Sequence, residues 1–323
     1  MDPLKLNYIG TTGIAVTTVG LGGGPIGQNP AVTDNISKNI IQTAFNSGIR
    51  YLDTAPYYGS GLSELRYSEA LSEPCPDYVI STKVGRLLKG TSEINFKTMK
   101  PNNLPYLDNV YDFSKDGIIK SFEQSMERLK LSTVDILYFH DVQREFYQQS
   151  IDSGILGLME LKSQGVKAIG VGVRDIKLLT EYAQTGVFDC LLVPGLYTLL
   201  DQSALPEVFT ECESRGISII IGGPYDSGFI TGSLKVAPEL QPKLDAINSV
   251  CTSYDVPLKA AAMQFPAAHP LVASVLTGPK SVRELQENIN MMSHPIKNEF
   301  WDALRSESLI SLDSPVPLIT DTE

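Results

Sequence analysis

Residues 134–193 decide the fold, and they read VDILYFHDVQREFYQQSIDSGILGLMELKSQGVKAIGVGVRDIKLLTEYAQTGVFDCLLV. Three short apolar runs, at 134–140, 166–171 and 190–193, are separated by two segments with helical periodicity. Runs rich in Val, Ile, Leu and Tyr are typical of strands that are buried on both faces. Each helical segment is followed by a glycine, which is a common signal for the end of a helix. The stretch therefore predicts an alternating α/β protein.

The same alternation extends towards both ends of the chain and predicts eight strands. These are Thr17–Leu21, Ile49–Asp53, Tyr78–Lys83, Val134–His140, Val166–Val171, Cys190–Val193, Ile217–Ile221 and Ala273–Leu276. Helices are predicted at Ile36–Ser47 with Asp34 as its N-cap, and at Lys115–Leu131, Ile155–Gln164, Ile176–Gln184, Gln202–Arg215, Lys243–Tyr254, Leu258–Phe265 and Val282–Met292. Eight strand–helix units predict a closed (β/α)8 TIM barrel, as a single domain over residues 1–323.

The main alternative is an open, doubly wound sheet that binds a dinucleotide. That fold carries G-x-G-x-x-G between its first strand and first helix. Here the first predicted strand runs into Gly20-Leu21-Gly22-Gly23-Gly24-Pro25, where the glycine spacing is wrong and the proline interrupts the turn. The barrel is therefore favoured.

Two segments lie outside the repeat. Leu4–Tyr8 and Ile14–Thr18 flank Gly10-Thr11-Thr12-Gly13 and predict an N-terminal β-hairpin that covers the floor of the barrel. The polar segment from Gly85 to Phe113 follows the third predicted strand, and a loop of this length in a compact domain is usually functional.

Composition narrows the class of protein. The 37 acidic residues exceed the 26 Lys and Arg, giving a net charge of -11, which argues against nucleic-acid binding and against adhesion to an anionic membrane. No apolar run is long enough to span a bilayer, and the N-terminus does not resemble a signal peptide. The four cysteines, Cys75, Cys190, Cys212 and Cys251, are widely spaced and are interpreted as reduced thiols of a cytoplasmic protein.

Polar side chains stand at or just after the ends of three neighbouring predicted strands, where barrel active sites lie. Asp53, Lys83 and His140 end the second, third and fourth strands, and Tyr58 follows Asp53 in the segment DTAPYYG. Taken alone, each has an ordinary structural role, as a helix cap, a rim aromatic, a solvated lysine or a core histidine. Their coincidence favours an active site.

These four groups also fit one chemistry. A phenol has an ordinary pKa near 10, and a nearby ammonium lowers it. A buried lysine keeps its charge where a carboxylate pairs with it, as Asp53 does in this interpretation. A neutral histidine orients a substrate oxygen, so the set predicts a general acid/base beside a carbonyl or carbinol. None of these side chains accepts a hydride, so redox chemistry requires a nicotinamide cofactor.

The order of these motifs resembles the aldo-keto reductase family, from about Val16 to Ile289. The resemblance implies a metal-free (β/α)8 barrel that uses NAD or NADP, with Asp53, Tyr58, Lys83 and His140 as its catalytic tetrad. The fifth and sixth strands depart from the family pattern. They are followed by Gly172-Val173-Arg174 and by Pro194-Gly195, without the usual Ser, Asn and Gln that hold the nicotinamide amide.

The resemblance also implies a set of cofactor contacts. Tyr197 is expected to stack on the nicotinamide ring, and the loop after the seventh strand is expected to cover the pyrophosphate. The segment after the eighth strand is expected to hold the adenosine half. The implied residues are Gly22, Asp53, Gly172, Val173, Tyr197, Gly223, Pro224, Asp226, Ser227, Gly228, Gly278, Lys280, Ser281, Glu287 and Asn288.

The departures point to the aldose 1-dehydrogenase subgroup, which includes L-fucose, D-threo-aldose and L-galactose dehydrogenases and a related pyridoxal 4-dehydrogenase. These departures from the family pattern are GVGV at 170–173, GLYTLLDQ at 195–202 and GGPYDSG at 222–228. The implied reaction oxidises C1 of an aldose of the L-fucose, L-galactose or D-arabinose type to a lactone, with NAD slightly favoured over NADP. An NADPH-dependent aldehyde reductase, a pyridoxal 4-dehydrogenase and a non-enzymatic cofactor-binding subunit are the alternatives. We expect a small sugar or aldehyde as the only kind of partner, and a monomer or a weak homo-oligomer.

Overall fold

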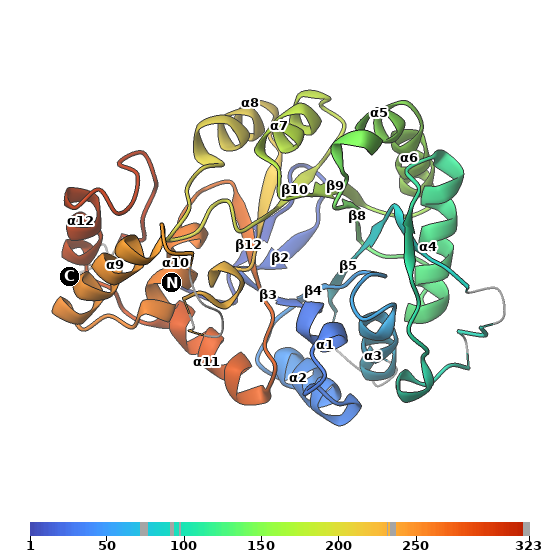
Figure 1. The fold of residues 1–323 in the computed structure, drawn as a ribbon, viewed down its shortest axis with the longest axis horizontal. Coiled ribbons are helices and arrows are strands. Elements are labelled where there is room, and N and C mark those ends of the chain that lie inside the picture. The colour runs from blue at the N-terminus through green and yellow to red at the C-terminus, as the bar shows by residue number, and fades with distance from the viewer. Residues whose placement is uncertain (72–76, 91–93, 97, 231, 233–236, 319–323) are drawn as a thin grey trace.

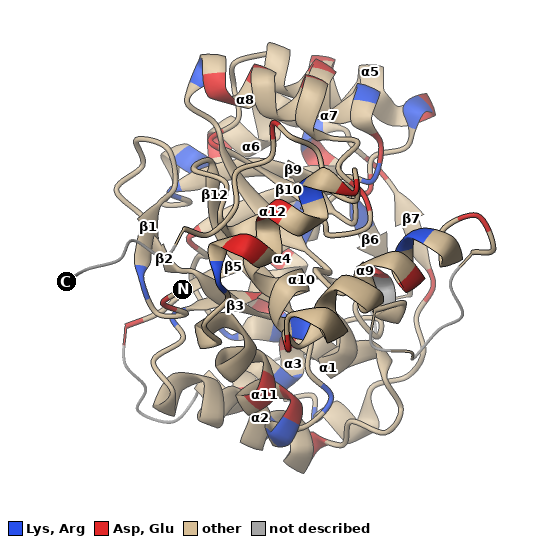
Figure 2. Ribbon diagram, turned by 90° about the vertical axis from the view of Figure 1, so that its left-hand side faces the viewer, with Lys and Arg blue, Asp and Glu red and all other residues tan. Residues whose placement is uncertain are grey.

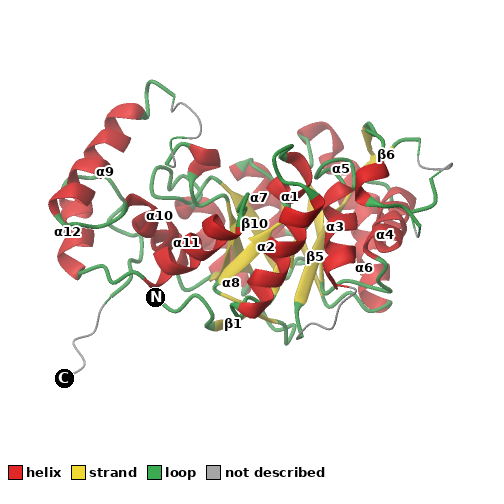
Figure 3. Cartoon of the chain, turned by 90° about the horizontal axis from the view of Figure 1, so that it is seen from below, coloured by secondary structure: helices red, strands yellow, loops and turns green. Residues whose placement is uncertain are grey.

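The computed structural model describes residues 1–71, 77–90, 94–96, 98–230, 232 and 237–318, so Cys75 lies outside the described residues. Eight parallel strands close into a barrel that helices surround (Figure 1; Figure 3). In order around the barrel they are β3 (Val19–Gly22), β4 (Tyr51–Asp53), β5 (Val79–Val84), β8 (Ile136–His140), β9 (Ala168–Gly172), β10 (Cys190–Pro194), β11 (Ser218–Gly222) and β12 (Val272–Thr277). Strand β12 pairs again with β3, which confirms the predicted (β/α)8 barrel.

All eight predicted strands overlap observed ones, and the first shows an informative difference. The predicted strand Thr17–Leu21 joins two elements, because Thr17 ends the hairpin strand β2 and β3 begins at Val19. The Thr17 hydroxyl donates to the Val19 carbonyl at 2.8 Å and accepts from the Arg50 N–H at 3.1 Å. These bonds replace ladder pairing at the corner where the chain turns from the hairpin into the barrel.

The N-terminal hairpin consists of β1 (Leu6–Tyr8) and β2 (Ala15–Thr17), paired antiparallel with Asn7 opposite Val16. The apolar side chains of Ile9, Ile14 and Val16 are buried. They pack with the first residues of four barrel strands, Tyr51, Ile136, Ala168 and Cys190, and with Ile220 in the middle of β11. The hairpin therefore closes the amino-terminal end of the barrel, as the sequence predicted, and leaves the other end as the mouth.

Helices form the outer layer, and charged residues are spread along them (Figure 2). They are α1 (Gly24–Gln28), α2 (Asp34–Asn46), α3 (Leu62–Leu71), α4 (Lys115–Leu129), α5 (Tyr147–Gln149), α6 (Ile155–Ser163), α7 (Ile176–Gln184), α8 (Thr210–Arg215), α9 (Gln241–Ser253), α10 (Leu258–Ala267), α11 (Val282–Ser293) and α12 (Asn298–Ser306). The predicted N-cap Asp34 is wrong: Thr33 caps α2 by accepting from the Ile36 N–H. Asp34 is already helical, and its carboxylate binds Arg66 at 2.8 Å.

Further differences from the predicted elements concern helices, and α1, α5 and α12 were also not predicted. The predicted helix Gln202–Arg215 begins only at Leu205, because the Gln202 amide donates to the carbonyls of Thr198 and Leu199. Helix α3 was not predicted, since its buried face is largely polar and gives no apolar periodicity.

The long segment after β5 carries structure of its own. Strands β6 (Arg86–Leu88) and β7 (Asn109–Tyr111) form a two-stranded antiparallel sheet. Leu88, Phe96 and Leu107 pack together under it as a small separate core. Because the segment follows the carboxyl end of β5 at Val84, its first strand lies at the mouth of the barrel.

A buried ion pair joins α3 to α4. The side chains of Glu64 and Arg128 are both fully buried, and Glu64 Oε2 lies 2.6 Å from Arg128 Nε. The other carboxylate oxygen accepts from the Thr82 hydroxyl of β5 at 2.7 Å, and Arg128 also donates to Ser125 at 3.1 Å. Since a buried charge is tolerated only with such partners, this pair holds two helices against the strand that carries Lys83.

Glu64→Gln keeps the shape of the side chain and leaves the Arg128 guanidinium uncompensated. We expect it to lower the free energy of unfolding by about 3–5 kcal/mol, the usual cost of breaking a buried pair. Urea denaturation followed by circular dichroism measures this. Glu160→Gln, which removes the half-exposed partner of Lys115, is the control and should change the midpoint little. Equal effects of the two substitutions would show that the buried pair has no special role.

Candidate active site

Four polar side chains meet at the mouth, at the carboxyl ends of adjacent strands. Asp53 is the last residue of β4, Lys83 the next to last of β5, and His140 the last of β8. These three strands are neighbours in the barrel, so their ends lie side by side. Tyr58 comes from the turn after β4. The structure thus brings together all four residues predicted to form the tetrad.

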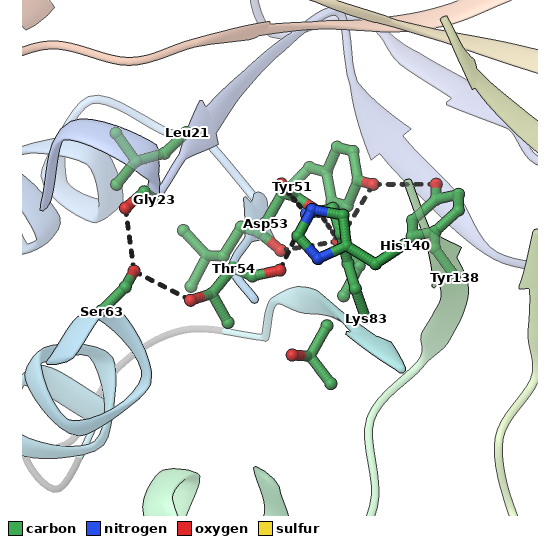
Figure 4. A network of polar contacts seen from close by, with 12 residues as sticks. Leu21, Gly23, Tyr51, Asp53, Thr54, Ser63, Lys83, Tyr138 and His140 are labelled. Atoms are coloured by element: carbon green, nitrogen blue, oxygen red, sulfur yellow. Dashed lines mark hydrogen bonds and ion pairs between the residues drawn. The ribbon is translucent and has the colours of Figure 1, made fainter. Parts of the chain in front are cut away.

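Lys83 and Asp53 form an ion pair that is almost completely buried. Lys83 Nζ lies 2.7 Å from Asp53 Oδ2, and the two side chains are 1% and 3% exposed. The ammonium also donates to the Thr54 carbonyl at 2.8 Å, and Asp53 Oδ1 accepts from the Ser81 hydroxyl at 2.7 Å. Figure 4 shows this network with His140 beside it. Both charges therefore have the partners that burial demands.

A polar chain continues below the ion pair into the barrel. The Tyr51 hydroxyl lies 3.2 Å from Ser81 Oγ and 3.1 Å from the Tyr138 hydroxyl (Figure 4). Burial raises the pKa of both phenols well above their ordinary value, so they stay neutral. These hydroxyls support the orientation of Asp53 without adding charge.

Tyr58 is held by a close crossing of two backbone segments. A Cβ on Gly59 would lie 2.1 Å from the Gly27 carbonyl oxygen, and a Cβ on Gly27 would lie 2.2 Å from the Tyr58 carbonyl oxygen. Only glycine permits this approach, and Gly59 also has a φ of +67°. The crossing fixes the partly exposed Tyr58, whose ring centroid lies 4.6 Å from Lys83 Nζ.

The charges of the site act on Tyr58 and Lys83 in opposite directions. Burial raises the pKa of the Tyr58 phenol, Lys83 lowers it and Asp53 raises it, and the net pKa lies above the ordinary value. The sequence predicted a lowered pKa, and the net direction is the reverse because burial outweighs the ammonium. Burial lowers the pKa of Lys83, but Asp53 and Tyr58 raise it by more. Lys83 therefore stays charged.

The His140 imidazole is neutral. Burial, then the charges of Lys83 and Arg86, hold its pKa well below the ordinary value. Its ring lies edge-on to Tyr58, with centroids 5.7 Å apart. Its Nδ1 is buried and makes no hydrogen bond to the described residues. A neutral imidazole beside a phenol is suited to bind and orient a substrate oxygen.

Arg86 and Asp141 lie beside the tetrad and were not among the predicted site residues. Arg86 Nη1 lies 2.7 Å from Asp141 Oδ2, and the same carboxylate oxygen lies 3.6 Å from His140 Nε2. Arg86 was overlooked because it opens a segment predicted only as a loop. Asp141 could have been identified from the sequence, because it directly follows a histidine at a strand end.

The predicted cofactor contacts include four glycines near strand ends, and these differ in what they pack against. A Cβ on Gly22 would meet the Thr277 carbonyl at 3.3 Å, and one on Gly278 would meet Pro25 at 2.7 Å. A Cβ on Gly172 would lie 3.1 Å from Leu192, next to the buried Val173. Neighbouring elements therefore already explain these glycines. A Cβ on Gly223, which has a φ of +65°, would meet nothing within 4 Å.

The loop after β11 is tied to the loop after β10. Asp226 is buried, and its Oδ1 accepts from the Thr198 hydroxyl at 2.7 Å. Burial raises the pKa of Asp226 to about 6. Pro224 is buried beside the open Gly223, and Asp226 and Gly228 bound a short 3-10 turn that includes Ser227. That this loop covers a pyrophosphate stays a prediction, and its Asp226 carboxyl faces Thr198.

Helix α11 begins after β12 with cationic side chains at its start. Ser281 accepts from the Glu284 N–H at 3.1 Å, and Glu284 Oε2 accepts from the Lys280 N–H at 2.8 Å. The side chains of Lys280 and Arg283 are exposed, and neither forms an ion pair with a described residue. Two free cations at a helix N-terminus, together with the open backbone at Gly223, fit an anionic dinucleotide.

The two predicted adenine contacts have protein partners. Glu287 Oε1 accepts from Lys259 Nζ at 2.7 Å. Asn288 is 6% exposed, and its Oδ1 accepts from the Tyr225 hydroxyl at 2.8 Å. The Asn288 amide nitrogen is not used in that bond, so it stays available as a hydrogen-bond donor.

The structure corrects the prediction made for Tyr197. Its side chain is fully buried, and its ring centroid lies 4.4 Å from that of Phe209 and 5.3 Å from that of Phe265. The edge of His269 covers it at 5.8 Å. The prediction that this ring stacks on a nicotinamide is wrong, because aromatic side chains of the outer helices already enclose it.

Within the described ranges, no group of three or more His, Cys, Asp or Glu residues is arranged to hold a metal ion. Across the same part of the chain, no helix is both long and apolar enough to cross a membrane.

Comparisons with known proteins identify the family. The model of the Aldo/keto reductase family matches residues 18–308. Pyridoxal 4-dehydrogenase of Microbacterium luteolum is 35% identical over 94% of this chain and 97% of its own length. D-threo-aldose 1-dehydrogenase of a Pseudomonas species is 34% identical over 92% of this chain and 96% of its own. A solved aldo-keto reductase from Bacillus halodurans in its holo form shares the fold, with a TM-score of 0.78 and 23% identity over 98% of this chain and 99% of that chain. By the family match and these identities, the chain belongs to the aldo-keto reductase family.

Proposed function

We propose that this chain is an NAD(P)-dependent oxidoreductase that oxidises the C1 hydroxyl of an aldose to the lactone. The observation that carries the proposal is the buried Lys83–Asp53 pair next to Tyr58 and neutral His140 at the barrel mouth. The likeness to a D-threo-aldose 1-dehydrogenase over almost the whole chain supports the substrate class.

In this proposal Tyr58 is the general base. As the C1 carbinol is oxidised, its hydroxyl proton passes to the phenolate oxygen of Tyr58 and its C1 hydrogen leaves as a hydride. Lys83 stabilises the phenolate electrostatically, and Asp53 keeps Lys83 charged and in place. Neutral His140 donates a hydrogen bond to the substrate oxygen and orients C1. A bound nicotinamide cofactor supplies the hydride acceptor.

The cofactor is proposed to lie between Gly223 and the start of α11, with NAD used at least as well as NADP. Lys280 and Arg283 have no acidic partner among the described residues, which favours an added phosphate. Against this, Glu284 lies at the same helix start and the net charge is -11. We therefore propose a small difference in preference between the two cofactors, in favour of NAD.

Oxidation of pyridoxal is the second candidate, because the relative with 35% identity is a pyridoxal 4-dehydrogenase. An NADPH-dependent aldehyde reductase and a non-enzymatic cofactor-binding subunit remain the weaker alternatives. A cytoplasmic location and a monomeric or weakly oligomeric state stay predictions.

A panel of aldoses and pyridoxal, each with NAD and with NADP, tests both parts of the proposal. We expect turnover on at least one aldose, followed by absorbance of the reduced cofactor, and kcat/KM with NAD at least equal to that with NADP. Lys280→Ala should weaken NADP use far more than NAD use, because only NADP carries the 2′-phosphate. Turnover on pyridoxal alone would favour the second candidate, and a clear NADP preference that Lys280→Ala abolishes would reverse the cofactor assignment.

Tyr58→Phe removes the proposed base and keeps the ring. We expect kcat to fall by about 10²–10⁴-fold, the usual contribution of a placed acid/base, while cofactor binding measured by fluorescence stays the same. The control is Tyr106→Phe at an exposed position of the long segment. A Tyr58→Phe enzyme with nearly normal turnover would exclude Tyr58 from this role.

Lys83→Met removes the ammonium that opposes the effect of burial on Tyr58. The pKa of Tyr58 should therefore rise further. Since oxidation needs the deprotonated phenol, activity increases as pH passes upward through this pKa, and the rising limb of the pH–kcat profile should move to higher pH. Lys89→Met, at an exposed position, is the control. A profile that loses height but keeps its position would show that Lys83 does not set this pKa.

A further inference from the structure

The Asp141 carboxylate lies at the mouth, within reach of a substrate held by His140. Asp141 directly follows His140, and its Oδ2 lies 3.6 Å from His140 Nε2. Its side chain is 47% exposed, in contrast to the nearly buried His140. A hydroxyl one carbon away from the oxygen that His140 orients would therefore come close to this carboxylate.

Arg86 holds this carboxylate and is itself tightly packed. Its guanidinium lies 3.5 Å from the ring centroid of Tyr57 and 5.1 Å from that of Tyr111. Arg86 is 7% exposed and donates from Nη1 to Asp141 Oδ2 at 2.7 Å. An arginine packed against two aromatic rings fixes the position of its carboxylate partner.

The pair leaves hydrogen-bonding capacity unused on both sides. Asp141 Oδ1 makes no hydrogen bond to the described residues, although an ionised carboxylate accepts on both oxygens. Arg86 Nε is buried without a partner in the same part of the chain. The half-exposed Asp141 carboxylate is therefore the member of the pair that a substrate hydroxyl can reach.

The backbone supports this interpretation. Asp141 has a φ of +49°, in the left-handed region that few non-glycine residues adopt, and its N–H donates to the Gly172 carbonyl at 2.8 Å. This conformation turns the carboxylate from the strand end towards Arg86. A pair that served stability alone would not require a half-exposed carboxylate beside His140.

We propose that Asp141 determines specificity by accepting a hydrogen bond from the hydroxyl next to the reacting carbinol carbon, and that Arg86 is its positioning residue. The site would thus select substrates with vicinal hydroxyls, in an aldose the hydroxyls on C1 and C2. This inference rests on the proposed aldose oxidation and names the part of the sugar that the site recognises.

The test compares an aldose that the enzyme oxidises with its 2-deoxy analogue, in the wild type and in Asp141→Gly. Glycine removes the carboxylate and accepts the left-handed backbone. We expect the wild type to prefer the 2-hydroxy sugar by about 10- to 100-fold in kcat/KM, the range for a hydrogen bond to a charged group. Asp141→Gly should lose this preference by slowing on the 2-hydroxy sugar alone. Glu145→Ala, an exposed acid on the following turn, is the matched control.

The outcomes separate the two proposals. Equal kcat/KM for both sugars in the wild type, or an equal loss on both in Asp141→Gly, would overturn the assignment of Asp141 while leaving aldose oxidation standing. Failure of the wild type to oxidise any aldose would overturn the proposed function, and the assignment with it.

Arg86 is tested by the same ratio. Arg86→Met should reduce the preference for the 2-hydroxy sugar, chiefly through KM, and Arg86→Lys should restore part of it because the ammonium still pairs with Asp141. Thermal melting of each variant checks folding. Loss of activity with an unchanged preference ratio, and with no rescue by lysine, would show that Arg86 is only structural.

Discussion

The buried ion pair between Lys83 and Asp53 is the constraint on which the mouth of this barrel depends. Either charge alone is costly there, because burial without a partner costs several kcal/mol for each ion. Their 2.7 Å contact therefore requires β4 and β5 to be adjacent and in register, as they are. The same ammonium is the main influence that opposes the effect of burial on the Tyr58 phenol. One interaction thus links the closure of the barrel to the acid/base properties of the site.

Rigid surroundings keep this pair in place. From below, Ser81 and the hydroxyl chain of Tyr51 and Tyr138 bond to the carboxylate through neutral groups. From the side, the Glu64–Arg128 pair bonds to Thr82, the residue before Lys83. Catalytic groups held by strands and by locked neighbours need little reorganisation when a substrate binds. The polar residues of the barrel interior and of α3 therefore serve the site as much as the fold.

Most of the fold and the tetrad were predictable because both depend on repetition. Strands buried on both faces leave continuous apolar runs, and a parallel barrel brings their ends together, so Asp53, Lys83 and His140 were found from position alone. The remainder depended on contacts between segments far apart in the sequence. Arg86 was hidden in a segment that forms its own small sheet. Tyr197 matched a motif, but side chains from η5 (Leu205–Phe209) and α10 enclose it, and no local pattern reports that.

Two of the three motifs that depart from the family pattern, at 195–202 and 222–228, are parts of one structural unit. Thr198, from the segment after β10, donates to Asp226, from the loop after β11, and Tyr197 anchors the first segment in the outer core. Burial raises the pKa of Asp226 from 3.8 to about 6, so the folded state holds this proton more tightly than the unfolded chain. Its contribution to stability is therefore present at low pH and is lost as the pH rises from about 4 to 6. At neutral pH the loop carries a buried carboxylate whose Oδ2 has no partner among the described residues. The two segments are therefore coupled: a substitution at Thr198 would remove the only hydrogen bond that the structure shows to the described Asp226 carboxylate.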